Sequence, residues 1–150
     1  SKLIAAVLTM ASGQNQPQWR PPVANPAHLM AGFRSPNSDY SSGHRGIDYL
    51  VWEQQSILSP SDGTVAFVGV VAGKPVLTIQ HSPSLRSALE PVCSSLKVGD
   101  RVVTGQIIGS VCGRGYHSHC EPLICLHYSL RSYGRYLSPL VQPEVYRQVC

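Results

Sequence analysis

Short segments in which apolar and polar residues alternate are the main structural signal in this chain. They carry β-branched residues and are bounded by turn residues, as strands usually are. Four segments show this texture: 63–71 (GTVAFVGVV), 75–81 (PVLTIQH), 97–111 (KVGDRVVTGQIIGSV) and 123–131 (LICLHYSLR). In the second segment Leu77, Ile79 and His81 fall on one face. The third segment reads as turn, strand, turn, strand, so the pattern predicts a chain of short strands.

The fold class follows from the spacing of these strands. Turn residues recur about every 8–12 positions, as in small sandwiches and barrels. We find no long helical period and no internal repeat. The pattern predicts an all-β domain, a compact antiparallel barrel or sandwich, over residues 28–150.

The first 27 residues have a different texture. Residues 1–14 (SKLIAAVLTMASGQ) contain one Lys, an apolar run and then small residues, which resembles the tail of a secretory signal segment. The apolar run is too short to span a bilayer, and a short amphipathic helix packed on the domain is the alternative. Residues 11–27 are rich in Pro, Gln and Asn and predict an extended arm.

Composition narrows the class of protein. Of the 150 residues, 43% are hydrophobic and 13% are charged, which indicates a globular chain rather than a disordered one. The net charge of +4 is mildly basic and suits an acidic partner or an anionic surface. No run of Lys and Arg is present, so we expect no nucleic-acid partner.

The chain has five cysteines, and none belongs to a Cys-x-x-Cys pair. The spacing therefore argues against a zinc ribbon or a thioredoxin-type motif. Several cysteines in a small, Lys-poor chain fit an oxidising compartment, so we expect the protein to be secreted or in the cell envelope. The odd count leaves one thiol over.

Two stretches offer metal ligands. In GHRGIDYL, residues 43–50, His44 and Asp48 are four positions apart, and Gly46 lets the backbone bend so that both can converge on one zinc. In HSHCEPLICLHY, residues 117–128, the third ligand could be the His117/His119 pair or His127. The residues alone leave both choices open.

Five motifs occur in a fixed order: GHRGIDYL, ILSPSDGTVAFVG, VLTIQH, LKVGDRVVTGQIIGSV and LHYSLRSYGRYLSPL. Their order and spacing resemble the LytM/lysostaphin-type zinc endopeptidases, which cut peptide cross-links in peptidoglycan. The resemblance covers about residues 36–141. Within the family, the sequence is most similar to a secreted actinobacterial branch. The resemblance implies a compact antiparallel β-barrel or sandwich that holds zinc in an open groove.

The resemblance also implies a ligand set. His44 and Asp48 match the family's His-x-x-x-Asp, and the string that follows His127 fits the strand that follows the family's last ligand. After His119, by contrast, Glu121-Pro122 would break a strand at once. We therefore expect His44, Asp48 and His127 to converge, each about 2.0–2.2 Å from a zinc ion when one is bound.

Two auxiliary histidines of the family are absent here. The first His of the family's His-x-His corresponds to Cys125, and the His of its Tyr-x-His-Leu string corresponds to Pro91. Neither proline nor a disulfide-bonded cysteine acts as a base or a proton donor. The resemblance therefore implies a domain with degenerate catalytic machinery.

Cysteine pairing can be narrowed but not fixed from the sequence. Cys120 lies five residues before Cys125 across a plausible turn, and Cys93 and Cys112 flank the hairpin-like segment 97–109. The simplest framework is Cys120–Cys125 and Cys93–Cys112, although four cysteines allow three pairings. This framework leaves Cys150 unassigned.

Three functions compete at this stage. The first is a secreted domain that binds peptidoglycan or its stem peptides, or regulates a wall hydrolase, without strong catalysis; Tyr40 and Arg45 are candidates to line its groove. The second is an active zinc endopeptidase that uses substitute groups such as His81, Glu90 or His117/His119. The third is a biotinyl- or lipoyl-carrier hairpin, which lacks the modified Lys and leaves the three ligand candidates unexplained.

Overall fold

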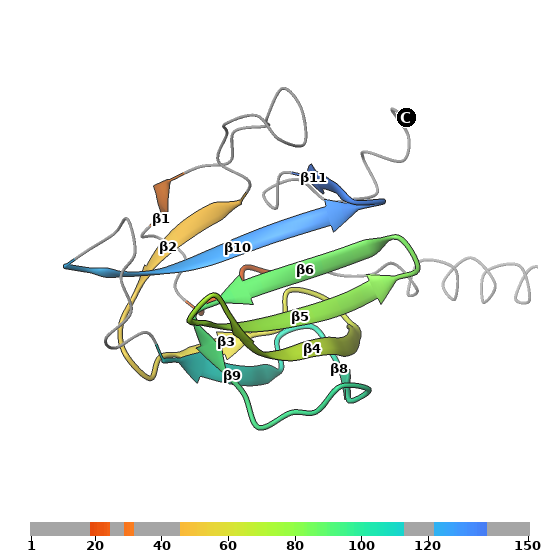
Figure 1. The fold of residues 1–150 in the computed structure, drawn as a ribbon, viewed down its shortest axis with the longest axis horizontal. Helices are drawn as coiled ribbons and strands as arrows, with labels where there is room; N and C mark the ends of the chain where they lie inside the picture. Colours follow the sequence, from red (N-terminus) through yellow and green to blue (C-terminus); the bar gives the residue numbers. More distant parts are fainter. Residues whose placement is uncertain (1–18, 25–28, 32–45, 113–121, 138–150) are drawn as a thin grey trace, which may run out of the picture.

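The computed structural model describes residues 19–24, 29–31, 46–112 and 122–137. Every regular element within these ranges is a β-strand (Figure 1). In chain order the strands are β1 (Leu29–Ala31), β2 (Ile47–Val51), β3 (Ser56–Leu58), β4 (Gly63–Val71), β5 (Lys74–Ser82), β6 (Leu85–Glu90), β7 (Val92–Cys93), β8 (Arg101–Val102), β9 (Ile107–Val111), β10 (Ile124–Ser132) and β11 (Arg135–Leu137). The all-β expectation is confirmed.

The strands form two antiparallel sheets. The larger has the order β1-β2-β10-β6-β5-β4-β8, with β11 added beside β10. The smaller has the order β3-β9-β7 and lies below one side of the larger sheet in Figure 1. Strand β10 runs between β2 and β6, so residues from three distant parts of the sequence meet at its edges.

Alternation gives the large sheet two different faces. On β6 buried and more exposed residues alternate without a break from Leu85 to Glu90. One face, which we call the core face, packs into the hydrophobic core with side chains that are essentially inaccessible: Ile47, Tyr49, Leu77, Ile79, Leu89, Leu126 and Tyr128. The other face, which we call the open face, carries the residues between them.

The hairpin of β4 and β5 shows how local sequence sets the register. Ala72 and Gly73 connect the strands and both have positive φ, 51° and 82°. Positive φ at both central residues matches the right-handed twist of a two-residue hairpin. The two strands predicted over 63–71 and 75–81 are both present, and β5 extends by one residue at each end.

Part of the predicted arm lies against the domain. The Leu58 amide donates to the Pro22 carbonyl at 2.8 Å, and the Arg20 amide donates to the Pro60 carbonyl at 2.8 Å. Val23 is only 3% exposed and belongs to the core. Residues 19–24 therefore contribute to the packing of the domain.

A disulfide joins Cys93 to Cys112, with an S–S distance of 2.01 Å and Cα atoms 5.7 Å apart. It links the end of β7 to the residue after β9, two strands that are already paired. This is one of the two bridges that the sequence suggested. Within the described ranges no helix could cross a membrane.

Candidate metal centre

Asp48 and His127 lie directly opposite each other on neighbouring strands, β2 and β10. The His127 Nδ1 and the Asp48 Oδ1 are 2.8 Å apart and form a hydrogen bond. Asp48 is fully buried, whereas 27% of the His127 side chain is exposed. The two predicted ligands that fall within the described residues therefore meet, although 79 positions separate them.

Strand alternation explains why both side chains reach the same place. Ile47 and Tyr49 point into the core, so Asp48 between them must point to the open face. Leu126 and Tyr128 do the same on β10, which sends His127 to that face as well. The core residues thus fix the direction of both polar side chains.

The chemistry of this pair fits a zinc ion. A carboxylate only accepts hydrogen bonds, so His127 Nδ1 carries the proton that it donates to Asp48. Two ligand atoms on one tetrahedral zinc are about 3.3 Å apart, slightly farther than the 2.8 Å seen here. A small opening of the pair and loss of that proton would make both atoms ligands.

The third predicted ligand, His44, lies outside the described residues. Among the residues that the structure does describe, no three His, Cys, Asp or Glu side chains gather as a metal-binding group. The described part of the site is therefore the Asp48–His127 pair, and His44 stays a prediction.

Gly46 lies beneath the His127 ring. A Cβ atom built at this position would sit 2.9 Å from both Cε1 and Nε2 of His127 and would collide with the Tyr128 carbonyl oxygen. Real Cβ atoms do not approach other atoms so closely. The glycine of the GHRGIDYL motif thus gives the imidazole its place next to Asp48.

Cys125 and Pro91 occupy the two positions at which the sequence predicts the loss of auxiliary histidines. Cys125 precedes His127 by two residues on β10, is 5% exposed and is disulfide-bonded. Its partner is not among the described residues, so the Cys120–Cys125 pairing stays a prediction. Pro91, which is buried, follows the last residue of β6.

Glu90 occupies the position beside His127 on the other side from Asp48. The register pairs His127 with Asp48 of β2 and with Glu90 of β6, so the three residues form one row across three strands. Glu90 is half-buried and belongs to the open face. A carboxylate is therefore available next to the predicted ligands.

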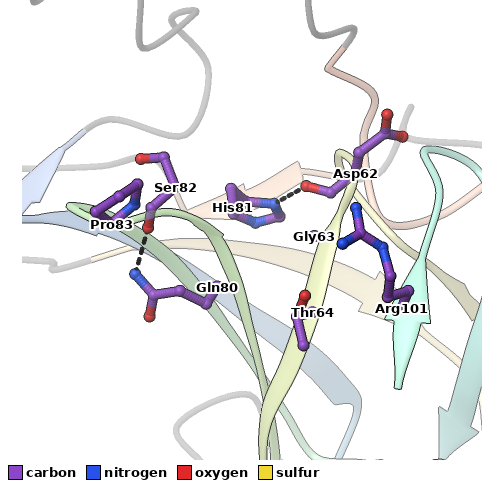
Figure 2. Close-up of a pocket in the computed structure, with 8 residues that line it drawn as sticks. All are labelled: Asp62, Gly63, Thr64, Gln80, His81, Ser82, Pro83 and Arg101. Carbon is purple, nitrogen blue, oxygen red and sulfur yellow. Dashed lines mark hydrogen bonds between the residues drawn. The ribbon is translucent and has the colours of Figure 1, made fainter. Parts of the chain in front are cut away.

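His81, one of the substitutes considered for catalysis, is held elsewhere. Its Nδ1 is 2.8 Å from the Asp62 carbonyl oxygen and its Nε2 is 2.7 Å from the Ser87 hydroxyl (the Asp62 contact is drawn in Figure 2). A carbonyl only accepts, so Nδ1 donates and the Ser87 hydroxyl donates to Nε2. Burial lowers the pKa of His81, against smaller opposing effects of Asp62.

His81 also contacts an aromatic ring and lines a pocket. Its ring meets the Trp19 ring edge-on with centroids 4.8 Å apart. His81 also lines a pocket of about 320 Å³ between β4, β5 and β8, whose other residues are Asp62, Gly63, Thr64, Gln80, Ser82, Pro83 and Arg101 (Figure 2). Its contacts with Trp19 and Ser87 give it a structural role.

Five other residues named in the sequence analysis lie outside the described residues. They are the groove candidates Tyr40 and Arg45, the alternative histidines His117 and His119, and Cys150. His127 contacts Asp48, and the choice of His127 over His117 and His119 stays a prediction.

Comparison with known proteins places this geometry in a family. The model for peptidase family M23 matches residues 42–139, which include Asp48, Glu90 and His127. This chain belongs to peptidase family M23. Uncharacterized proteins of Mycobacterium bovis and Mycobacterium tuberculosis are each 30% identical to it over 123 residues, 79% of this chain and 49% of the relative. The chain thus spans about half the length of the curated relatives it matches.

Several solved structures share the fold. Csd3 of Helicobacter pylori superposes with a TM-score of 0.66 and is 30% identical, over 82% of this chain and 34% of Csd3. The catalytic domain of the antimicrobial peptidase lysostaphin from Staphylococcus simulans superposes with a TM-score of 0.61. It is 20% identical, over 79% of this chain and 91% of that domain. One chain of a complex of SpoIIIAH and SpoIIQ superposes with a TM-score of 0.65. It is 18% identical, over 82% of this chain and 98% of that chain.

Sequence reasoning missed two residues that the open face brings together, Arg86 and Arg131. They are direct register partners on β6 and β10. Each falls on the polar positions of an alternating strand, and that was the available signal. The pairing of the strands, which the sequence alone did not supply, makes them neighbours.

Proposed function

We propose that this M23 domain binds peptidoglycan stem peptides on its open face, holds zinc with His44, Asp48 and His127, and hydrolyses cross-links feebly or not at all. The observation that carries the proposal is the contrast on one strand, β10. His127 keeps its contact with Asp48, while Cys125, two residues earlier, is tied up in a disulfide.

The proposed site keeps its metal ligands but lacks the auxiliary groups that would transfer protons or stabilise an oxyanion. When bound, zinc would supply Lewis-acid polarisation of a carbonyl group and activation of water. Asp48 and His127 would orient it. Pro91 and Cys125 offer no group to take a proton or to donate to a developing oxyanion. General acid–base help is worth about 10²–10⁴ in rate and an oxyanion donor about 10²–10³, so residual hydrolysis should be very slow.

The proposed setting is outside the cytoplasm, in the cell envelope. One disulfide is described in full and Cys125 belongs to another, and such bridges persist in oxidising compartments. Peptidoglycan and its stem peptides are the proposed ligands, and a wall hydrolase or envelope protein is a second proposed partner. The likeness to a SpoIIIAH and SpoIIQ complex supports the idea that such a fold can serve protein contacts.

A second candidate function rests on Glu90. Its register position beside His127 puts a carboxylate next to the predicted ligands. Carboxylates act as general bases when they can reach the proton that is removed. The alternative is therefore an active zinc endopeptidase in which Glu90 takes the role of the absent histidines.

One experiment separates the two functions. Purified protein is analysed for zinc and incubated with purified, insoluble peptidoglycan, and both binding and release of soluble fragments are measured. We expect binding with little or no release. Chelator-sensitive release that is lost in His127→Ala would overturn the proposal, and its loss in Glu90→Gln with zinc content unchanged would establish the second function.

A further inference from the structure

A row of polar residues crosses the open face at the end away from Asp48. It follows one line of register partners from β8 to β11, and direct partners point to the same side of a sheet. The row is Arg101, Thr64, Gln80, Arg86, Arg131 and Tyr136. Its centre is the pair Arg86 and Arg131, both of which are exposed.

These two arginines place like charges directly opposite each other, an arrangement that destabilises a sheet. Arg86 is nonetheless fixed in place. Its Nε donates to the Gln80 Oε1 at 2.8 Å, and Gln80 is in turn held because its Nε2 donates to the Ser82 carbonyl oxygen at 2.6 Å. Gln80 orients the guanidinium without neutralising it.

Arg131 is held in a similar way by neutral groups. Its guanidinium carbon lies 5.0 Å from the centroid of the Tyr136 ring, and its Nη2 is 3.5 Å from the Gly134 carbonyl oxygen. Within the described residues neither Arg86 nor Arg131 has a carboxylate partner. Two preorganised positive charges therefore face outward at one point.

The distance from this pair to the predicted metal ligands is set by the strands. Arg131 follows His127 by four residues on β10, and Arg86 precedes Glu90 by four on β6, with regular register between them. At about 3.3 Å per residue, four residues span about 13 Å. An extended peptide covers the same distance with about four residues.

Small side chains line the open face between the arginine pair and the predicted metal ligands, and we call this strip the floor. Ser129, Ala88 and Thr78 are register partners across β10, β6 and β5. The Thr78 hydroxyl is buried and makes no hydrogen bond with the residues that the structure describes. The floor therefore consists of short side chains only.

We infer that Arg86 and Arg131 form a subsite for a free carboxylate of an extended peptide, about four residues away from the predicted metal centre. This inference rests on the proposed function, because it names the part of the ligand that the open face selects. Arg101 lies farther along the row, in the pocket of Figure 2 that Asp62 also lines. That end has a carboxylate of its own, so the anion is assigned to Arg86 and Arg131.

The test compares two synthetic peptides, pentaalanine with a free C-terminal carboxylate and pentaalanine with a C-terminal amide. Binding to the full chain is followed by NMR titration of backbone amides at low salt. We expect the carboxylate to bind more tightly, and Arg86→Gln or Arg131→Gln to weaken it about two- to fivefold each. Arg135→Gln is the matched control, because Arg135 is exposed on β11 but falls outside the row.

Each outcome decides the inference. Equal binding of the acid and the amide to the unmodified chain would overturn it without any variant. So would an effect of Arg135→Gln as large as that of Arg131→Gln, since the attraction would then be unspecific charge. If the peptide results hold but the chain does not bind insoluble peptidoglycan, the subsite stands and the proposed function fails. If peptidoglycan binds but acid and amide do not differ, only the subsite fails.

Discussion

At the scale of single residues, the site depends on Gly46, whose lack of a side chain makes room for a neighbour. A Cβ atom at Gly46 would collide with the His127 ring and with the Tyr128 carbonyl oxygen, so glycine leaves room for both. The position of His127, a predicted metal ligand, is therefore set by a neighbour that makes no bond to it. Groups that orient ligands typically change metal affinity about 10–100-fold when they are altered.

We predict that Gly46→Ala lowers zinc affinity at least about tenfold, because the new Cβ displaces His127 from Asp48. Overpacking of this kind also costs about 1–3 kcal/mol of unfolding free energy. Zinc affinity is measured by competition with a coloured chelator. Gly134→Ala is the control, because it strains a positive-φ turn without touching His127. An unchanged zinc affinity in Gly46→Ala would refute the role given to the glycine.

A second residue-scale prediction concerns His81 and pH. Burial lowers its pKa in the folded state below the ordinary value of 6.5, so the unfolded chain binds the proton more readily. The free energy of unfolding is then full above about pH 6.5 and falls as pH drops below it, by at most about 1.4 kcal/mol per pH unit for one proton. Urea unfolding at pH 7.5 and 5.5 should show a smaller fall in His81→Gln than in the unmodified chain. Identical falls would contradict it.

At the scale of elements, β7 and β9 are joined twice, by strand pairing and by the Cys93–Cys112 disulfide. The bridge closes a loop with a sequence separation of 19 residues. Restricting a loop of this size in the unfolded chain is worth about 3 kcal/mol. The small sheet, with only short strands, gains the most from this restriction.

We expect the Cys93→Ser/Cys112→Ser variant to lose about 3 kcal/mol of unfolding free energy, measured by urea denaturation. Intact mass provides the control. Reduction should add about four hydrogens to the unmodified chain, two for each bridge, and about two to the variant, in which the Cys125 bridge remains. A loss below about 1 kcal/mol would show that the bridge does little for the folded state.

The long strands were predictable from the sequence, whereas the short ones were not. The segments that became β4, β5 and β10 contain enough alternating positions to show a period. Strands of two or three residues, such as β7 and β8, show none. Asp48 and His127 were matched through family motifs, since no local pattern links residues so far apart. The Arg86–Arg131 pair was missed because it depends on which strands pair and in which register.

At the scale of the whole molecule, the predicted metal site joins distant parts of the chain. The site draws on β2 and β10, which pair across a long stretch of sequence. A ligand that joins them binds the folded chain only, since the unfolded chain does not hold Asp48 and His127 together. Metal binding should therefore add directly to the stability of the whole domain.

We predict that zinc raises the midpoint of thermal unfolding. At a hundredfold excess over the dissociation constant the gain is about 2.7 kcal/mol, which corresponds to about 5–10 °C for a domain of this size. The rise is measured by calorimetry with zinc and with chelator, and magnesium serves as the control ion. Asp48→Ala should abolish the rise. A rise of the same size in that variant would show that zinc binds elsewhere.

The two faces of the large sheet are subject to different constraints on substitution. On β10, Leu126, Tyr128 and Leu130 are buried and cannot change without cost, whereas His127 and Arg131 are at least partly exposed and are less constrained by core packing. Substitutions at these outward positions leave the inward half of the strand unchanged, and that half still directs the same architecture. Loss of an old chemistry and acquisition of a new ligand are, in such a sheet, mutations that folding does not oppose.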